Sequence, residues 1–303
     1  MSAAHSHLLS GRGVLLSVTA SCVFAALGWY TVLLTPLAGI DIYAWRVVWT
    51  VPAMLLVLAL LRHGPRLRTM LGRLRHEKRL WLALPVCALL LAIQQWLFMW
   101  APLEGRLLEV SLGYFLLPLV MVLVGRVFYH ERLSRLQWLA VAFALAGVLH
   151  ELWLTRAFSW VTLLTALGYP PYLMLRRHVQ LEAVSGFLLE TLLILPWAAW
   201  HLASHPLATS ALTLKPMLWL LLPGLGALTA WAFASYLAAS RLLPMSLLGI
   251  LGYVEPALLF IISVAFLHEP FSASGLGTYV PIWIAIVLTC SQSALQLRRQ
   301  LRS

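Results

Sequence analysis

The hydrophobic pattern of this chain consists of long apolar runs that are separated by short polar connections. A helix needs about 20 mostly apolar residues to cross the hydrocarbon core of a bilayer. Ten runs are of about that length: 13–34, 43–61, 80–100, 109–128, 136–154, 158–175, 183–202, 216–240, 246–267 and 275–297. The pattern therefore predicts an all-α polytopic membrane protein with ten transmembrane helices.

One motif occurs in both the fourth and the ninth run. In each copy a Leu-Gly-Tyr sequence leads to a proline, Pro118 or Pro256, and a His-Glu pair follows with its glutamate thirteen positions later, at Glu131 or Glu269. A proline inside a helix lacks an N–H group and frees the carbonyl four residues before it. Within a membrane such a carbonyl must find a partner or line a cavity. A broken helix in each half of the chain is typical of the central binding site of transporters.

Ten spans with one duplicated motif predict two units of five helices each. Because five is an odd number, the second unit enters the membrane inverted relative to the first. We therefore expect a first repeat at 13–154 and a second at 158–297, with tails at 1–12 and 298–303. In such inverted repeats the substrate binds near the middle of the bilayer, between the halves.

The basic residues give the orientation. With the N-terminus inside, 17 of the 21 Lys and Arg residues lie on the cytoplasmic side, and Arg46 lies within a span. Those seventeen are Arg12, Arg62, Arg66, Arg68, Arg73, Arg75, Lys78, Arg79, Arg126, Arg132, Arg135, Arg176, Arg177, Arg241, Arg298, Arg299 and Arg302. Arg106, Arg156 and Lys215 lie outside. Cytoplasmic loops carry an excess of Lys and Arg, so we expect both termini in the cytoplasm and a multi-pass protein of the bacterial inner membrane.

The connections also carry information about local structure. The segment 62–79 is either a plain orientation signal or a short amphipathic helix on anionic lipid headgroups. The segment 205–215 is the longest external connection and is nearly uncharged.

Composition excludes several classes of protein. Hydrophobic residues make up 62% of the chain and charged residues 10%, whereas soluble domains carry about 25% charged residues. The net charge of +11 does not indicate a nucleic-acid partner, because the basic residues lie in short connections and form no basic face interleaved with aromatic residues. There is no phosphate-binding Walker motif, and the three cysteines have no metal spacing. We expect no metal, no cofactor and no direct use of ATP.

The two His-Glu pairs, at 130–131 and 268–269, do not continue to a histidine at the spacing of a zinc helix. They are predicted to cap helix ends at opposite faces of the membrane. Glu109 and the pair at 150–151 lie at the external ends of their spans, where anchoring at the interface is the expected role. Glu109 is also a candidate for substrate binding or proton coupling.

Ionisable residues within spans are costly and are functional candidates by default. Glu255 lies midway along its span, Glu190 lies two turns into the seventh span, and Arg46 lies one turn into the second. Arg46 has two further interpretations, which are an outward orientation toward the interface and a pairing with Asp41. Polar and aromatic residues at a depth compatible with a pocket complete the candidate set: Gln94, Gln95, Tyr114, Tyr253, Trp96 and Trp231. Packing is the alternative role of each aromatic residue.

Several segments resemble EamA-domain proteins of the drug/metabolite transporter superfamily, and RarD-type permeases within it. The likeness is carried by the two proline-to-glutamate segments and by Arg-Val-Val-Trp at 46–49, Leu-Phe-Met-Trp-Ala at 97–101, Glu-Val-Ser-Leu-Gly-Tyr-Phe at 109–115, Gly-Phe-Leu-Leu-Glu-Thr at 186–191 and Leu-Pro at 195–196. It covers nearly the whole chain and implies a permease. The RarD name implies a link to chloramphenicol, and the wider group includes exporters of amino acids and of opine-type metallophores. The chain departs from the RarD pattern at 94–95 and at Glu255.

We therefore predict a secondary transporter, not an enzyme, that exports a small amphipathic or zwitterionic metabolite by alternating access. Glu190 and Glu255 would bind an ammonium group and Arg46 a carboxylate, as suits an amino acid or an amino-acid-derived metallophore. Either glutamate could also exchange a proton, so a proton is a candidate partner. A monomer and a homodimer are both compatible with this prediction.

Two alternatives stay open. The first is a drug efflux permease of the chloramphenicol type. The second, more remote, is a polytopic membrane enzyme that acts on lipid-linked substrates with Glu109 and the His-Glu pair at 150–151.

Overall fold

The computed structural model describes residues 10–103, 106–156, 158–258 and 275–302, and within these ranges every regular element is a helix. The elements are α1 (Gly11–Tyr30), η1 (Thr31–Leu34), α2 (Gly39–Leu60), α3 (Gly64–His76), α4 (Lys78–Leu103), α5 (Leu107–Phe128), α6 (Arg135–Thr155), α7 (Trp160–His178), α8 (Ala183–Ser204), α9 (Pro206–Leu214), α10 (Leu218–Leu242), α11 (Met245–Leu251) and α13 (Leu276–Arg302). Nine of the ten predicted spans coincide with one helix each, to within five residues at either end. The ninth begins as α11, and its second half lies outside the described residues.

Seven helices of the described chain are long and apolar enough to cross a membrane, namely α1, α2, α4, α5, α6, α8 and α10. Two shorter apolar helical stretches are Met245–Leu258 and Leu276–Gln292. The helix α7 has the length of a span but is less apolar. Some of its polar side chains, such as Thr162, Thr165 and Arg176, are buried inside the protein. The all-α membrane fold is thus confirmed, with seven spans of the predicted ten identified by length and composition.

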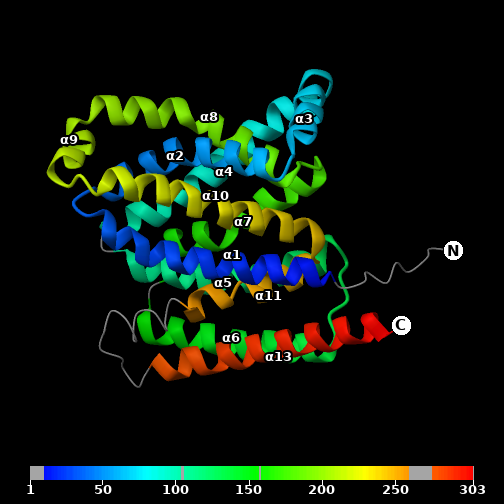
Figure 1. Cartoon of the computed structure of the whole chain (residues 1–303). Helices are drawn as coiled ribbons and strands as arrows, with labels where there is room; N and C mark the ends of the chain where they lie inside the picture. The colour runs from blue at the N-terminus through cyan, green and yellow to red at the C-terminus, as the bar shows by residue number, and fades with distance from the viewer. Residues whose placement is uncertain (1–9, 104–105, 157, 259–274, 303) are drawn as a thin grey trace.

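The helices lie roughly parallel in one bundle (Figure 1), and close contacts bring distant parts of the chain together. Helix α1 packs along α10, and α2 packs against both α8 and α10. Helix α5 contacts α7 and α11, and α6 lies beside α13 at one edge. A Cβ atom on Gly147 of α6 would lie 2.6 Å from the carbonyl oxygen of Thr278 in α13. Small residues of this kind allow membrane helices to approach closely.

The two proline-containing helices differ. Helix α5 continues through Pro118, whereas α11 ends at Leu251 and a turn at Gly252 and Tyr253 precedes the next helical residues. The predicted break is therefore present before Pro256 and absent at Pro118. The Tyr253 hydroxyl donates a hydrogen bond of 2.9 Å to the carbonyl of Phe115, one residue after the carbonyl that Pro118 leaves without its helical partner.

One end of the bundle gathers residues 62–79, 126–135, 176–182 and 240–246, and is called the arginine-rich end below. It lies at the right in Figure 1, and α9 lies at the opposite end. Of the two interpretations of the segment 62–79, the less favoured one, a short helix, describes its structure, because residues 64–76 form α3. Arg73 of α3 donates to the carbonyl oxygens of Val179 and Gln180, at 2.9 and 3.0 Å. Helix α3 is thus docked on the α7–α8 turn. The connection 205–215, predicted as a loop, forms α9.

Candidate functional site

Arg46 points into the protein interior from α2 and is 7% exposed. Its Nε atom donates to Oγ1 of Thr229 at 3.0 Å, and its guanidinium lies 5.8 Å from the ring centre of Phe233, both on α10. The carboxylate of Glu255 lies nearby, without forming a direct ion pair with Arg46. The two structural interpretations of Arg46 were wrong. The side chain does not extend outward, and Asp41 binds Nε2 of His201 instead, at 2.9 Å. Sequence spacing alone could not show that a histidine 160 residues away contacts the carboxylate of Asp41.

Glu255 follows the turn at 252–253 and lies directly before Pro256. Its side chain is partly accessible, although it sits midway along the predicted span. Among the described residues its carboxylate accepts no hydrogen bond, and Arg46 is the charged group that acts on it. Buried polar groups are normally hydrogen-bonded, so a carboxylate with free acceptor capacity in the interior calls for an explanation. One explanation is a ligand that donates hydrogen bonds to this carboxylate.

Four tyrosines surround this pair of charges. Tyr114 and Tyr169 lie near both Arg46 and Glu255, Tyr236 lies near Glu255, and Tyr43 lies near Arg46 on α2. The hydroxyl of Tyr43 is buried and has no hydrogen-bond partner among the described residues. Of the four, Tyr114 was predicted from the sequence and the other three were missed.

One signal could have pointed to Tyr169, because it directly precedes the pair Pro170–Pro171 inside a span. Interior prolines are the same feature that drew attention to Tyr114 and Glu255. Tyr43 and Tyr236 carry no such local signal.

A small cavity lies beside Arg46, between α2, α4, α8 and α10. Its polar lining consists of Arg46, Thr50, Gln95, Thr191 and Thr229. Of the predicted residues, Arg46 and Gln95 are therefore brought together here. The cavity and the four tyrosines around Arg46 and Glu255 are called the central site below.

Gln94 has a different position from its neighbour. Its amide nitrogen donates to the carbonyl of Leu164 in α7 at 2.8 Å. The side chain fits because residue 168 is a glycine. A Cβ atom added at that position would lie 1.7 Å from the amide nitrogen of Gln94. Gln94 therefore joins α4 to α7.

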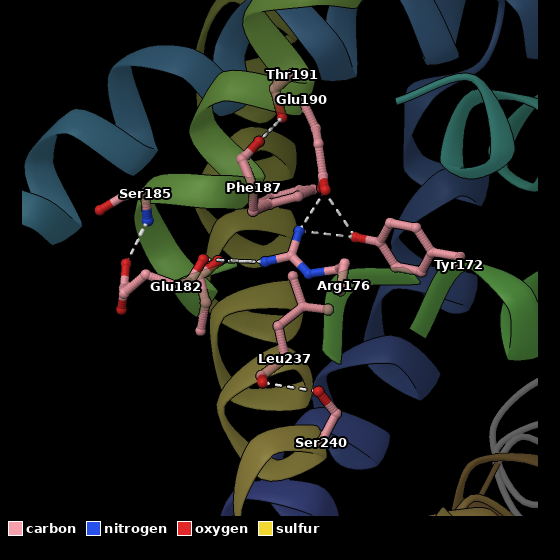
Figure 2. A network of polar contacts seen from close by, with 10 residues as sticks. Tyr172, Arg176, Glu182, Ser185, Phe187, Glu190, Thr191, Leu237 and Ser240 are labelled. Carbon is pink, nitrogen blue, oxygen red and sulfur yellow. Dashed lines mark hydrogen bonds and ion pairs between the residues drawn. The ribbon is translucent and has the colours of Figure 1, made fainter. Parts of the chain in front are cut away.

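Glu190 lies outside the central site, in a sealed ion pair between α7 and α8 (Figure 2). It is 0% exposed and accepts from Nη1 of Arg176 at 2.5 Å and from the hydroxyl of Tyr172 at 2.9 Å. Nη2 of Arg176 donates to the carbonyl oxygens of Glu182 and Ala183 at the start of α8. The charge of Glu190 is thus neutralised within its own helical hairpin, which leaves no free charge for a substrate. The sequence reasoning missed Arg176 because it assigned that residue to a polar connection.

The other predicted residues also have defined positions. Tyr253 is buried and bridges to α5, and Trp96 stacks on Trp100 with ring centres 5.1 Å apart. Trp231 is 54% exposed on the outer face of α10, which it shares with Leu220 eleven residues earlier. Within the described part of the chain, no hydrogen bond, ion pair or ring contact joins any of these three to the residues of the central site.

Glu109 lies at the end of the bundle opposite the arginine-rich end. It accepts a hydrogen bond from Oγ of Ser159 and lies 3.5 Å from Nη1 of Arg106. His150 and Glu151 both contact Oγ1 of Thr278, at 3.0 and 2.7 Å. These contacts join the ends of neighbouring helices, and anchoring at the membrane interface stays a prediction for these residues. Within the described residues, no group of three His, Cys, Asp or Glu side chains could hold a metal ion.

The apolar helices and the charged interior define a multi-pass membrane protein with a polar site enclosed among its helices. Comparison with known proteins gives the family. Residues 11–150 match the EamA-like transporter family. The chain is 54% identical over 294 residues to the "Chloramphenicol-sensitive protein RarD" of Pseudomonas aeruginosa, which covers 97% of this chain and 98% of the relative. It is 33% identical to "Protein RarD" of Escherichia coli, over 95% of this chain and 97% of that one.

Further similarity extends across bacteria. The "Uncharacterized transporter YojE" of Bacillus subtilis is 33% identical over 93% of this chain and 94% of its own. One solved crystal structure shares the fold with a TM-score of 0.63 at 19% identity, over 93% of this chain and 98% of that one. The chain therefore belongs to the EamA-like transporter family, as a permease of the RarD type and not an enzyme.

Proposed function

We propose that this permease exports a small zwitterionic metabolite, either an amino acid or an amino-acid-derived metallophore of the opine type. Arg46 binds the carboxylate of the substrate and Glu255 binds its ammonium group. The observation that carries this proposal is that the buried Arg46 donates one side-chain hydrogen bond among the described residues, to Thr229, while the nearby Glu255 carboxylate accepts none. The tyrosine hydroxyls beside them supply further donors and acceptors.

A zwitterion suits this pair of charges for an electrostatic reason. An uncompensated charge inside a membrane protein is costly. In the empty protein Arg46 and Glu255 compensate each other, and in the loaded protein each faces the opposite charge of the substrate. The interior is therefore neutral in both states, as a carrier that returns empty requires.

We further propose that the protein works by alternating access between two inverted repeats, at 13–154 and 158–297, with ten spans in all. The helices α2 and α8 support this proposal. Each has 22 residues, with a proline at the fourteenth, Pro52 and Pro196, and an ionisable residue at the eighth, Arg46 and Glu190. The two helices pack against each other, as helices related by a pseudo-twofold axis between the repeats would.

Other helices at corresponding places in the two halves share a proline spacing or pack against each other. Pro85 and Pro223 are 138 positions apart in α4 and α10, and Pro118 and Pro256 are separated by the same interval. Helix α5 packs against α11 and α6 against α13, so helices at corresponding places in the two halves are neighbours. These contacts are those expected when a pseudo-twofold axis runs between the repeats.

The proposed orientation places the arginine-rich end in the cytoplasm of a bacterial cell, with both termini on that side of the inner membrane. The distribution of 17 of 21 basic residues supports it. Export then corresponds to uptake into inverted membrane vesicles.

The test is uptake of a panel of labelled amino acids into such vesicles, for the wild type and for the variants Arg46→Gln and Glu255→Gln. Hydrogen bonds to charged groups contribute about 1.5–3 kcal/mol, so each variant should lower transport about 10- to 100-fold. The control is Glu109→Gln, which removes a carboxylate at the external end of α5 and should transport as the wild type does. Full transport by both central variants would overturn the proposal.

Efflux of a drug is the second candidate function, because a relative that is 54% identical carries the name "Chloramphenicol-sensitive protein RarD". The same variants distinguish the two functions. A drug-resistance phenotype that persists in Arg46→Gln and Glu255→Gln would favour drug efflux over export of a zwitterion.

A further inference from the structure

The connection between α10 and α11, residues 240–246, is held at the arginine-rich end by side chains from two other parts of the chain. The first is Arg177, at the end of α7. Its Nε donates to the carbonyl of Ser240 at 3.0 Å, and its Nη2 donates to the carbonyl of Leu243 at 2.7 Å. Its guanidinium lies 5.3 Å from the ring centre of Tyr129, which follows α5. A cation at the carbonyl end of a helix is favourable, because the last carbonyls lack helical partners.

The second side chain is Glu131, which follows α5 in the first half of the protein. Its Oε1 accepts from the backbone N–H of Met245 at 2.7 Å, and its Oε2 accepts from the N–H and the hydroxyl of Ser246, at 2.9 and 2.5 Å. The prediction that Glu131 caps a helix end is confirmed, and the capped helix is α11 in the other half of the chain. The corresponding pair at 268–269 lies outside the described residues.

This connection lies at the arginine-rich end and joins two helical segments that carry central-site residues, α10 with Tyr236 and the segment after α11 with Glu255. The side chain of Leu243 also packs closely against α1, since a Cβ atom on Gly13 would lie 2.8 Å from its Cδ2. A substrate that enters along α10 from the arginine-rich end would therefore pass the segment that Arg177 and Glu131 hold in place.

We propose that Glu131 and Arg177 form a latch that keeps the α10–α11 connection closed across the cytoplasmic entrance to the central site. The latch must release before the substrate can enter. This inference rests on the proposed orientation and on the role of the central site.

The surroundings of the latch suit a contact that opens and closes. Glu131 and Arg177 are both partly exposed, so water can replace each hydrogen bond when the contact breaks. The ion pair of Glu190 with Arg176 has the opposite character, because it is buried and joins two helices of one hairpin. Opening it would leave both charges without water or partner.

The experiment measures a distance and needs no substrate. Spin labels are placed at Arg132 and Arg241, which are exposed at the arginine-rich end on the two sides of the latch. The native Cys22, Cys87 and Cys290 are first replaced by serine. Double electron–electron resonance then gives the distribution of distances between the labels in vesicles. With the latch intact we expect one narrow distribution.

In Glu131→Gln, and separately in Arg177→Gln, the distribution should broaden and shift to longer distances. The matched control is Glu182→Gln, because Glu182 also caps a helix at this end but caps its own helix α8, through the N–H of Ser185 at 2.7 Å. Its distribution should equal that of the parent protein. Unchanged distances in both latch variants would overturn the proposal, as would an equal shift in the control.

A milder variant covers the case in which Glu131→Gln does not fold. Ser246→Ala removes only the hydroxyl contact and should give a smaller shift in the same direction. Because the distance is measured without substrate, the latch can be confirmed even if the vesicles transport no amino acid. A negative transport result would then count against the proposed function alone.

Discussion

Two acidic residues, Glu190 and Glu255, lie in the membrane-embedded part of this permease, and their surroundings differ in every respect. Glu190 has no exposed surface and is hydrogen-bonded to Arg176 and Tyr172 within one hairpin. Glu255 is partly accessible, follows a helix break, and accepts no hydrogen bond from the described residues. Both were equal candidates by sequence. The difference teaches that hydrogen-bond saturation separates a structural charge from one that is available to a ligand.

The largest effect is expected from removing the partner of Glu190. Arg176→Met leaves a buried carboxylate without its cation, which should destabilise the fold by about 3–5 kcal/mol. Thermal unfolding of the purified protein, followed by circular dichroism, measures the loss. The double variant Arg176→Met, Glu190→Leu should recover much of it, since no charge then remains. An unchanged unfolding temperature in Arg176→Met would contradict the structural role.

Glu255→Gln should lower transport strongly and change stability less. Its carboxylate makes no hydrogen bond within the described chain, so the free energy of unfolding should fall by less than in Arg176→Met, although Arg46 loses a neighbouring negative charge. Transport should nevertheless fall about 10- to 100-fold. The measurement combines vesicle uptake with thermal unfolding on the same preparations. A loss of stability as large as that of Arg176→Met would show that Glu255 is structural as well.

Two tyrosines test the same contrast on a smaller scale. Tyr253→Phe removes a hydrogen bond to Phe115 and should lower stability by about 1 kcal/mol without changing KM. Tyr43→Phe removes a buried hydroxyl without a described partner, so stability should hold while KM rises if the hydroxyl contacts the substrate. Thermal unfolding curves and the kinetics of vesicle uptake distinguish the structural role from the substrate-binding role. A destabilised Tyr43→Phe with unchanged KM would place that hydroxyl outside the site.

The smallest effect concerns α3, outside the membrane. Hydrogen bonds from Arg73 and Arg79 lower the pKa of Glu77 to about 2. A carboxyl with a lowered pKa contributes stability above its ordinary pKa and loses it as the pH falls toward the folded value. The docking of α3 should therefore loosen as the pH falls from about 4.5 to about 2. A spin label at the exposed Arg68 should become more mobile over that range, and less so in Glu77→Gln, where the contribution is already absent.

The positions of the helices could be predicted from the sequence because apolar length is a property of each segment alone. The helical spans were predicted in this way, and the capping role of Glu131 was predicted from its place at the end of a span, whereas the helix in 62–79 was only one of two interpretations. The partners of charged residues could not be predicted, since they depend on how helices pack. Arg176 reaches Glu190 across a turn, and His201 reaches Asp41 across 160 positions. The tyrosines of the central site lie on α2, α5, α7 and α10 and meet only in the folded bundle.

The central claim is that Arg46 and Glu255 bind the two charged ends of one substrate. The most direct measurement compares vesicle uptake of a labelled zwitterionic metabolite with uptake of its N-acetyl and carboxamide derivatives. In the wild type, blocking either end should lower transport at least about 10-fold. In Glu255→Gln the N-acetyl derivative should be transported as well as the free amine. Equal transport of all three compounds by the wild type would contradict the account.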